Sequence, residues 1–583
     1  MPIEKRWVLK PQGEPSKVAE LAAATGIPEV LSNLLIQRGI DTNEKVSKFL
    51  SPKLTDLHDP FLMKDMDKAV SRVGQAIERG EKIMVYGDYD VDGTTAVALV
   101  YIFLRQQGVE NLLFYIPDRY TEGYGISQRG VEYAKEKGVN LIIALDCGIK
   151  AVEKVAYANR LGIDFIICDH HLPGDELPAA VAVLDPKRSD DNYPFDELSG
   201  CGVGFKLVQG YCLSKGIPFE NIAGLLDLVA VSTAADIVPL VGENRILAHY
   251  GLKKLNDSPR KGLRAIIKIC GLEGHKITID DIVFKIGPRI NAAGRMRADM
   301  SEKSGGHAAV NLLIERNEDL ADELGILIDN NNQVRKSIDR SVTQEAHDYI
   351  QSHPEFRDLR STVIYNPKWM KGIVGIVASR LIETYYRPTV VLTMSNGFVT
   401  GSARSVPGFD LYQAVESCAD LLENFGGHMY AAGLTMRPEN VEAFTIRFND
   451  YVASNIDPEM LLPQVEIDSE LLFSDITPTF RAMLESFQPF GPGNNAPVFL
   501  TRGVTNRGDA KLVGAEREHL RMDLMQKQKP NTTIAAIAFQ QPTHFEWIKG
   551  GRPIDICYTV VENHYRGKVT PQLRVKDIKP VIK

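Results

Sequence analysis

Between residues 82 and 184 short apolar runs alternate with longer amphipathic stretches, and this alternation strongly limits the folds open to the chain. The stretches TAVALVYIFLRQQG, SQRGVEYAKEKG and AVEKVAYANRLG read as helices, each ending at a glycine. The apolar runs predict five strands: Lys82–Tyr86, Leu112–Ile116, Leu141–Leu145, Phe165–Cys168 and Ala180–Leu184. Apolar strands separated by helices predict a parallel sheet covered on both faces.

Acidic and histidine side chains follow three of these strands. DYDVDG follows the first strand, LDCG contains the end of the third, and CDHH the end of the fourth; together they supply Asp88, Asp90, Asp92, Asp146, Asp169, His170 and His171. The carboxyl ends of neighbouring parallel strands meet in one crevice, so these groups are expected to converge. Crowded carboxylates disfavour their own charged forms, and a pair of divalent cations relieves this. Carboxylate and imidazole ligands suit Mn²⁺ or Mg²⁺ better than a thiolate metal.

Each motif taken alone has a simpler explanation. A D-x-D after a strand is more often a turn or a helix cap, and a lone D-H-H is more often a surface loop. Asp146 could cap a helix, and Asp236, which follows the apolar helix predicted in NIAGLLDLVAVSTAADIVPL, could cap it or form a salt bridge. The coincidence of three motifs at successive strand ends favours the two-metal site. Two metals about 4 Å apart can clamp the attacking and leaving oxygens of a phosphoryl group.

Basic and glycine-rich segments favour phosphate over a carbonyl substrate. FKIGPRINAAGRMRAD places Lys285, Arg289, Arg295 and Arg297 among small residues. GSARS places an arginine between two serines, which together suit anionic oxygens. GGHMYAAG, with Gly426 and Gly427, permits close backbone approach to an anion. A single arginine is more often part of a surface ion pair, so it is the combination of these segments that favours phosphate.

The rest of the chain adds further domains, as its length of 583 residues requires. Residues 308–350 predict a long connecting helix, and a second strand–helix unit follows from STVIYN to GGHMYAAGLT. From about residue 461 short β-rich runs suggest a small barrel or sandwich. This last segment has 16 Lys and Arg against 13 Asp and Glu, or +3, while the whole chain carries −8, which leaves −11 elsewhere. The C-terminal part is therefore the more tolerant of anions.

The composition, 44% hydrophobic and 24% charged, is that of a soluble globular protein. No apolar run reaches the roughly 18 residues that span a bilayer, and MPIEKRWVLK has no apolar signal core. The seven cysteines form no C-x-x-C pair, so neither a disulfide framework nor a zinc site is expected, and a reducing compartment such as the cytoplasm fits.

The motifs DYDVDG, LDCG and CDHH resemble those of the DHH phosphoesterase superfamily, and GSARS with GGHMYAAG resembles its companion DHHA1 domain. GPRINAAGRM and the C-terminal β-rich segment are similar to the RecJ family of single-strand-specific 5′→3′ exonucleases. The resemblance implies a multidomain α/β protein with a parallel-sheet DHH domain, a long connecting helix, an α/β DHHA1 domain and a C-terminal all-β OB-fold. The implied boundaries are an N-terminal segment 1–50, DHH domain 51–307, linker 308–355, DHHA1 domain 356–460 and OB-fold 461–583.

The resemblance also implies the roles of single residues. The metal ligands for two Mg²⁺ or Mn²⁺ ions are Asp90, Asp92, Asp146, His170 and Asp236, with Asp146 bridging the two. The catalytic residues are His171, which faces the scissile phosphate, Asp169, which orients a histidine, and Asp88. The substrate-binding residues are Arg119, Tyr124, Arg289, Asn291, Arg295, Ser402, Arg404 and His428. In the OB-fold the candidates for base stacking are Phe499, Tyr558 and Tyr565, each of which could equally belong to the core.

The implied activity is hydrolysis of single-stranded DNA to 5′-mononucleotides in DNA repair and recombination. The expected protein is a cytoplasmic monomer without membrane contact, with a single-strand-binding protein and a helicase as candidate partners. Two alternatives stay open at this point. One is a phosphoesterase for small substrates, such as an oligoribonuclease, a cyclic-dinucleotide hydrolase or a pyrophosphatase, which would generally lack the C-terminal barrel. The other is a non-catalytic nucleic-acid-binding scaffold, which would have lost ligands.

Overall fold

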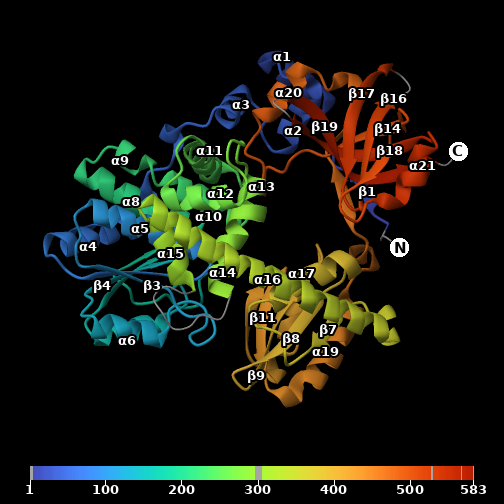
Figure 1. Ribbon diagram of the computed structural model, residues 1–583. Coiled ribbons are helices and arrows are strands. Elements are labelled where there is room, and N and C mark those ends of the chain that lie inside the picture. Colours follow the sequence, from blue (N-terminus) through green and yellow to red (C-terminus); the bar gives the residue numbers. More distant parts are fainter. Residues whose placement is uncertain (1–3, 296–304, 527–528, 566–567, 582–583) are drawn as a thin grey trace. The chain divides into compact units, whose positions relative to one another are not determined.

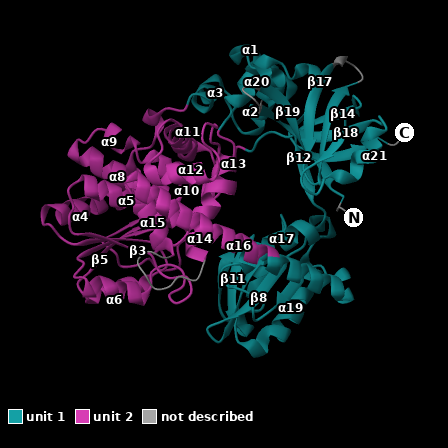
Figure 2. Ribbon diagram, viewed as in Figure 1, with its two compact units in different colours: residues 1–51, 341–488, 495–583 teal, residues 52–340, 489–494 magenta. Residues whose placement is uncertain are grey.

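The computed structural model describes residues 4–295, 305–526, 529–565 and 568–581 (Figure 1). The chain divides into two compact units (Figure 2). One unit, the acidic-sheet unit, consists of residues 52–340 and 489–494, and the other consists of residues 1–51, 341–488 and 495–583.

A parallel five-stranded sheet forms the centre of the acidic-sheet unit. Its strands are β2 (Ile83–Gly87), β3 (Leu112–Tyr115), β4 (Leu141–Leu145), β5 (Asp164–Cys168) and β6 (Ala182–Leu184). They lie in the order β3-β2-β4-β5-β6, and every neighbouring pair is parallel. The predicted sheet is therefore confirmed. The three strands that carry acidic motifs, β2, β4 and β5, are direct neighbours, so their carboxyl ends lie side by side along one edge.

Helices cover both faces of this sheet, as Figure 1 shows. Helices α6 (Gln128–Glu136) and α7 (Val152–Arg160) supply apolar side chains to a core on one face. On the other face lie α4 (Met66–Glu78), α5 (Val91–Gln106), α8 (Gly200–Lys215), α10 (Leu226–Ala235), α11 (Gly242–Asp257), α12 (Lys261–Ile269) and α15 (Gly306–Ile314). Helix α5 is apolar around most of its circumference, which is typical of a helix packed on all sides, and its first turn lies directly after the aspartate loop.

Two helices differ from their predicted extent. The helix predicted in residues 221–240 is two helices, α9 (Glu220–Ala223) and α10, and Gly224 follows the first of them. The predicted connecting helix is α16 (Glu318–Ser352), which begins later than expected because α15 ends at Ile314. Between them the Asn317 side chain accepts a hydrogen bond from the Leu320 amide at 3.1 Å. This polar cap starts a new helix where the sequence suggested continuity.

A mixed sheet with helices on it forms the second strand–helix region. Its strands are β7 (Thr362–Tyr365), β8 (Thr389–Ser395), β9 (Phe398–Arg404), β10 (Leu422–His428) and β11 (Ala431–Met436), in the order β10-β11-β9-β8-β7. The pair β7–β8 is parallel and the other pairs are antiparallel. Helix α17 (Val374–Tyr385) packs on β8 and β9, whereas α18 (Leu411–Glu416) and α19 (Val441–Asn455) share an apolar core with the sheet.

The C-terminal region is a β-barrel, as predicted. Its strands are β13 (Ser469–Glu470), β14 (Phe499–Asn506), β15 (Lys511–Val513), β16 (His519–Gln526), β17 (Lys529–Ala538), β18 (Ile554–Tyr565) and β19 (Lys568–Pro580). Strand β14 pairs with both β18 and β16, which closes the sheet on itself. Short helices α20 (Pro478–Glu485) and α21 (Phe545–Lys549) accompany the barrel.

The prediction of base stacking is wrong for Phe499 and Tyr558, because both side chains are fully buried in the barrel. Their positions point inward on paired strands, and the Tyr558 hydroxyl lies 2.8 Å from the hydroxyl of Thr501. The side chain of Tyr565 lies outside the described residues.

The N-terminal segment contributes a strand to the same unit as the barrel. Strand β1 (Arg6–Leu9) pairs in parallel with β12 (Gln464–Ile467), and helices α1 (Pro15–Thr25), α2 (Glu29–Gln37) and α3 (Asn43–Leu50) follow it. The Trp7 indole donates a hydrogen bond to Asp577 at 2.7 Å, which ties β1 to β19.

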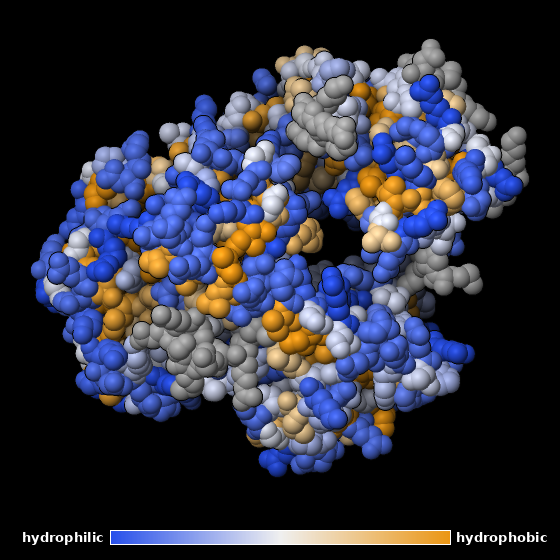
Figure 3. Space-filling view, viewed as in Figure 1, coloured by the Kyte–Doolittle hydropathy of each residue, from blue (hydrophilic) through white to orange (hydrophobic). Residues whose placement is uncertain are grey.

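The surface seen in Figure 3 is mostly hydrophilic, with apolar residues in small separate groups. Among the described residues no single helix is long and apolar enough to cross a membrane; α1 and α2 reach that length and composition only as a pair, bent by 113°. All seven cysteines are unpaired.

Candidate active site

The loop after β2 makes a tight turn into α5 and carries the first three aspartates. Asp90 caps the helix, because its Oδ1 accepts a hydrogen bond from the Gly93 amide at 3.0 Å. A Cβ atom at Gly93 would lie 2.5 Å from the carbonyl oxygen of Asp88, so the turn requires glycine there. Asp88 is buried, and its Oδ1 has no hydrogen-bond partner in the described part of the chain. The turn therefore holds one buried and unpaired carboxylate beside the carboxylate that caps the helix.

Asp92 is fixed by the N-terminus of α8. Its two carboxylate oxygens accept hydrogen bonds from the backbone amides of Gly200 and Cys201, each at 2.7 Å, and one also accepts from the Ser232 hydroxyl at 2.6 Å. A helix N-terminus carries partial positive charge and unpaired amides, so it stabilises a carboxylate. The side chain of Ser199 caps the same helix. Helix α8 thus supplies a favourable interaction to the acidic cluster.

Asp146, directly after β4, has a left-handed backbone conformation with φ 58°. Its amide donates to the carbonyl of Cys168 at 2.9 Å, which keeps it at the edge of the sheet. A Cβ atom at Gly200 would lie 2.5 Å from the Cβ of Asp146, so only glycine fits at the start of α8. The close approach brings Asp146 and the amides that hold Asp92 into one compact site.

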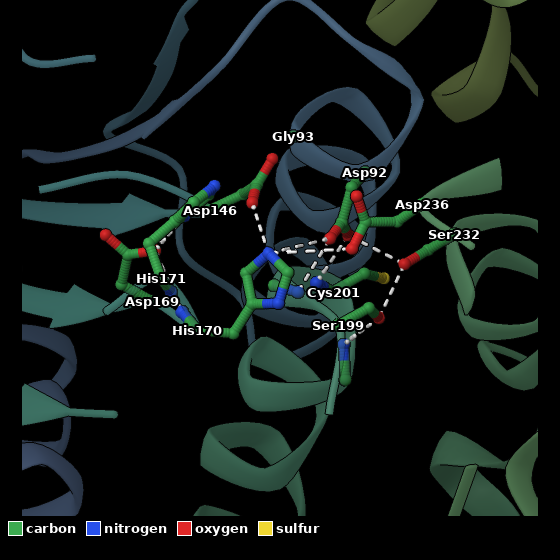
Figure 4. Close-up of polar contacts among 12 residues, drawn as sticks. Asp92, Gly93, Asp146, Asp169, His170, His171, Ser199, Cys201, Ser232 and Asp236 are labelled. Carbon is green, nitrogen blue, oxygen red and sulfur yellow. Dashed lines mark hydrogen bonds and ion pairs between the residues drawn. The ribbon is translucent and has the colours of Figure 1, made fainter. Parts of the chain in front are cut away.

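His170 lies at the centre of this cluster (Figure 4). Its Nε2 lies 3.2 Å from Asp146 Oδ1, 3.6 Å from Asp236 Oδ2 and 3.7 Å from Asp92 Oδ2. Neither ring nitrogen has a hydrogen-bond partner among the described residues, although both are buried. Ligands of an octahedral ion at about 2.1 Å lie about 3 Å apart, so this spacing fits atoms that share a cation.

Two overlapping groups of side chains can each hold a metal ion. One consists of Asp92, His170 and Asp236, and the other of Asp146, His170 and His171. Their donors are carboxylate oxygens and imidazole nitrogens, which Mn²⁺ and Mg²⁺ accept. The orphaned nitrogens of His170 and the orphaned oxygen of Asp88 show that the residues present fit such ions.

Mutual repulsion dominates the electrostatics of the cluster. Burial, and then the charge of Asp92 and its neighbours, raises the pKa of Asp146 and of Asp236 well above the ordinary value. Burial, and then the charge of Asp90, raises the pKa of Asp88 well above the ordinary value. Burial, and then the charge of Asp92, raises the pKa of Asp90. Cations bound here would remove this cost by favouring the ionised carboxylates.

His171 makes different contacts from His170. Its Nδ1 lies 2.7 Å from Asp169 Oδ1, and its Nε2 lies 3.1 Å from the hydroxyl of Tyr124. Burial alone would lower the pKa of His171, but the hydrogen bond and charge of Asp169 outweigh it and raise the pKa to about 9. Burial would likewise raise the pKa of Asp169, yet His171 lowers it to about 2. Asp169 therefore favours the protonated form of His171, whose side chain is 45% exposed.

The remaining predicted substrate residues of the acidic-sheet unit have contacts of their own. The guanidinium carbon of Arg119 lies 4.2 Å from the ring centroid of Tyr89, on the aspartate loop. In α14 (Gly287–Arg295) Asn291 accepts a hydrogen bond from the Val91 amide at 3.1 Å, so it supports that loop. Arg289 pairs with Asp329 at 2.8 Å. The carbonyl of Arg295 accepts from the Tyr120 hydroxyl at 2.6 Å, and Arg297 lies outside the described residues.

Ser402, Arg404 and His428 lie together on one face of the mixed sheet. Ser402 and Arg404 are two residues apart on β9 and so point to the same side, and strand register aligns Arg404, Ala431 and His428 in one row. Arg404 donates to the Ser402 hydroxyl at 2.8 Å. A Cβ atom at Gly375, in the first turn of α17, would lie 3.0 Å from Ser402 Oγ and 3.1 Å from Arg404 Nη2.

This face also has open space. The next row across the strands is Ser402, Gly433 and Gly426, and a Cβ atom at either glycine would meet no atom within 4 Å. Burial lowers the pKa of His428, and the charge of Arg404 lowers it further. This face can bind an anion, because it combines an arginine, a serine and a helix N-terminus with two glycines that leave space above the sheet.

Sequence reasoning missed the residues that hold Asp92. Ser232 lies inside an apolar helix, and the contributions of Gly200 and Cys201 are backbone amides, which leave no side-chain signal. The run SGCGVG, a helix cap followed by glycines, was the available clue. Asp185, after β6, is also buried, with Oδ2 unpartnered within the described ranges, and burial raises its pKa to about 7.

Comparison with protein families covers most of the chain. The model of the DHH family N-terminal domain matches residues 82–233, that of the DHHA1 domain matches 359–454, and that of the RecJ OB domain matches 467–577. A single-stranded-DNA-specific exonuclease RecJ from Bacillus subtilis (strain 168) is 37% identical over 98% of this chain and 70% of its own length. The protein of that name from Escherichia coli (strain K12) is 33% identical over 97% of this chain and 98% of its own length.

Solved structures agree with this likeness. The crystal structure of RecJ in complex with Mn²⁺ from Thermus thermophilus matches with a TM-score of 0.82 and 26% identity, over 99% of this chain and 80% of that one. The Mg²⁺ complex of the same protein matches with a TM-score of 0.77 and 25% identity, over 99% of this chain and 79% of that one.

Gly200→Ala should displace Asp146 and the amides that hold Asp92. The added methyl group meets backbone and Cβ atoms, so the cost is about 1–3 kcal/mol of overpacking together with weaker Mn²⁺ binding. Gly202→Ala is the matched control, because its Cβ would make only ordinary contacts at 3.4 Å. Thermal unfolding and Mn²⁺ calorimetry test both variants. Equal behaviour of the two would contradict the close packing inferred here.

His170→Ala and His171→Ala should differ in metal binding. His170 belongs to both candidate ligand groups, so its loss should weaken Mn²⁺ binding at both positions. His171 is engaged by Asp169 and Tyr124, so its loss should leave most of the Mn²⁺ affinity. Calorimetric titration with Mn²⁺ compares them. An equal loss of affinity in both variants would instead make His171 a ligand.

Proposed function

The chain belongs to the RecJ family, and from this premise we propose that it is an exonuclease that hydrolyses single-stranded DNA from the 5′ end and releases 5′-mononucleotides. The observation that carries the proposal is the buried cluster of aspartates around His170, with donor atoms spaced for two divalent cations. The match to the RecJ OB domain favours a nucleic-acid strand over the small substrates of other phosphoesterases. The full set of ligand types favours an enzyme over a binding scaffold.

We assign the ligands of two Mg²⁺ or Mn²⁺ ions to Asp90, Asp92, Asp146, His170 and Asp236, and we propose that Asp146 would be a ligand of both ions. Such ions supply Lewis-acid activation of water and neutralise charge on the scissile phosphate. The chain's own contribution is to hold the ligands rigidly. The α8 amides fix Asp92, and the packing of Gly200 fixes Asp146.

His171 stabilises the negative charge that develops on the phosphate. Asp169 accepts a hydrogen bond from Nδ1 and keeps the ring cationic, which leaves Nε2 available beside Tyr124. Preorganised donors of this kind act mainly in the transition state. The low pKa of Asp169, about 2, means that it stays a carboxylate and serves as the orienting residue.

The second unit would recognise the end of the strand. Arg404 and Ser402 can grip a 5′ phosphate, a dense dianion, and His428 and the bare strip at Gly426 and Gly433 let the chain approach closely. Arg119 would contribute positive charge near the metal site, because it lies over Tyr89.

The proposed setting is DNA repair and recombination in the cytoplasm, with the protein acting as a monomer. A single-strand-binding protein and a helicase are the partners that such an enzyme would need, since one covers single strands and the other produces them. Co-sedimentation with each partner, at matched salt concentrations, tests this part of the proposal.

Asp146→Asn should abolish hydrolysis, by at least about 100-fold, even at saturating Mn²⁺, because it removes a charged ligand of the proposed metal site that lies 3.2 Å from Nε2 of His170. The measurement uses strands labelled at the 5′ or the 3′ end and a duplex, each with Mg²⁺, Mn²⁺ or EDTA. Asp67→Asn, an exposed aspartate on α4, is the control and should keep full activity. Near-normal turnover of the Asp146 variant would refute the metal assignment.

Arg404→Ala should raise KM most for strands with a 5′ phosphate and shrink the preference for them over 5′-hydroxyl strands. Arg437→Ala removes an exposed arginine that follows β11 of the same sheet and pairs with Glu423, and it should change neither. Initial rates on matched strands compare the variants. An undiminished preference would exclude Arg404 from end recognition, and release of mononucleotides from the 3′ end would overturn the proposed polarity.

A further inference from the structure

Ile237, the residue directly after the proposed metal ligand Asp236, has a backbone conformation that isoleucine rarely adopts. Its φ is 63°, in the left-handed region. A β-branched side chain is strained there, because Cβ comes close to a backbone carbonyl oxygen. Other non-glycine residues of the described chain share this conformation, but none of them is β-branched. Ile237 is therefore the most unusual of these positions, and it lies beside the acidic cluster.

The fold imposes this conformation through the contacts on either side of Ile237. Helix α10 ends there, and the Asp236 amide still donates to the Ser232 carbonyl at 2.9 Å. The chain then turns so that Leu240 is buried, with its amide donating to the carbonyl of Pro492 at 2.7 Å. A left-handed residue commonly ends a helix at such a turn, and glycine is the usual choice. The turn thus explains the conformation but not the isoleucine.

Packing does not explain the isoleucine either, because 62% of Ile237 is exposed. Apolar area that stays in water gains no hydrophobic stabilisation, whereas the strained backbone costs free energy of folding. Leu172, which follows His171, is a contrast: it is 68% exposed, but its φ is not positive. Strained residues of this kind cluster at functional sites. The isoleucine is best explained by contact with a molecule that binds beside Asp236.

Ile237 lies close to the bond that the proposed reaction breaks. Its Cα follows that of Asp236 by about 3.8 Å, and the Asp236 carboxylate points toward His170, 3.6 Å from Nε2 (Figure 4). Hydrolysis breaks the bond between phosphorus and O3′ of the departing nucleotide, while water supplies hydroxide to phosphorus and a proton to O3′. The carbon that carries O3′ is bonded to C2′. The sugar of the departing nucleotide is therefore the apolar group that binds nearest to the metal ligands.

We infer that Ile237 is a specificity-determining residue, which packs against the deoxyribose of the departing nucleotide and disfavours a ribose there. In deoxyribose, C2′ presents only hydrogens, and this apolar surface gains from contact with isoleucine. In ribose, the 2′-hydroxyl would lose water against that side chain without gaining a hydrogen bond. The 2′-hydroxyl is the group by which a protein tells RNA from DNA at one site. The inference rests on the proposed function and adds its selection of the sugar.

Strands that differ only in the sugar of the 5′-terminal nucleotide test the inference. One terminal ribonucleotide should lower kcat/KM of the wild type by about 5- to 100-fold relative to an all-deoxy strand, as expected for one hydroxyl left without a hydrogen bond. Ile237→Asn should lose most of this discrimination, because an amide can hydrogen-bond the hydroxyl. Ile446→Asn, which removes an isoleucine of 57% exposure from α19, is the control and should discriminate like the wild type.

Thermal unfolding without metal tests the strain independently of activity. Asparagine adopts the left-handed conformation more readily than isoleucine, so Ile237→Asn should melt at least as high as the wild type. Ile446→Asn should melt lower, because asparagine is the weaker helix former. A lower melting temperature of Ile237→Asn would show that the isoleucine stabilises the fold, and the inference would lose its basis.

Equal discrimination by the wild type and Ile237→Asn would overturn the inference. So would a difference between these two proteins that disappears when the terminal nucleotide is abasic, because the contact would then be with the base. Cleavage of the all-deoxy strand by the wild type reports separately on the proposed function. If that strand is cleaved without discrimination, only the inference fails; if neither strand is cleaved with Mn²⁺, the proposed function fails and the inference with it.

Discussion

Mutual repulsion among buried carboxylates is the constraint on which the acidic-sheet unit depends. Asp92, Asp146 and Asp236 surround the imidazole of His170, and burial raises the pKa of Asp88, Asp90, Asp146 and Asp236. Packing and hydrogen bonds must therefore offset the repulsion and keep these carboxylates close together. The unit does so with a parallel sheet that aligns strand ends, a left-handed residue at Asp146, and a helix whose first amides bind Asp92. Each device limits what the sequence can contain, and Gly93 and Gly200 are the clearest examples.

The two compact units differ in the charge of the side chains that they present. The acidic-sheet unit concentrates negative charge that only cations can balance, so it suits bond cleavage. The mixed sheet presents Arg404 and Ser402 beside Gly426 and Gly433, which have open space above them. This surface suits a phosphate group and has no means of reading a base sequence. Binding through phosphates and stacking is what an enzyme that degrades any strand requires.

The sequence predicts the parallel sheet and its acidic edge well. The alternation of apolar runs with amphipathic stretches, and the acidic residues at the ends of those runs, are local signals. The sequence predicts poorly the direction and the contacts of side chains that tertiary packing determines. Phe499 and Tyr558 are aromatic residues on β-strands, and only barrel closure shows that they point inward. Asn291 accepts a hydrogen bond from the Val91 amide, a contact between residues 200 positions apart that no local pattern reveals. Ser232 and the amides of α8 lie far from Asp92 in sequence, so no local pattern reveals their contact.

The most direct test is the thermal unfolding of the wild type and Asp146→Asn with and without Mn²⁺. Asparagine tolerates the left-handed conformation and removes one repelling charge. The metal-free variant should therefore melt higher than the metal-free wild type, by about 1–2 °C for each kcal/mol of relieved repulsion in a unit of this size. Mn²⁺ at 100 times its dissociation constant should stabilise the wild type by about 2.7 kcal/mol for each ion bound, and the variant much less. A variant that melts lower without metal, or gains as much from Mn²⁺ as the wild type, would contradict the account.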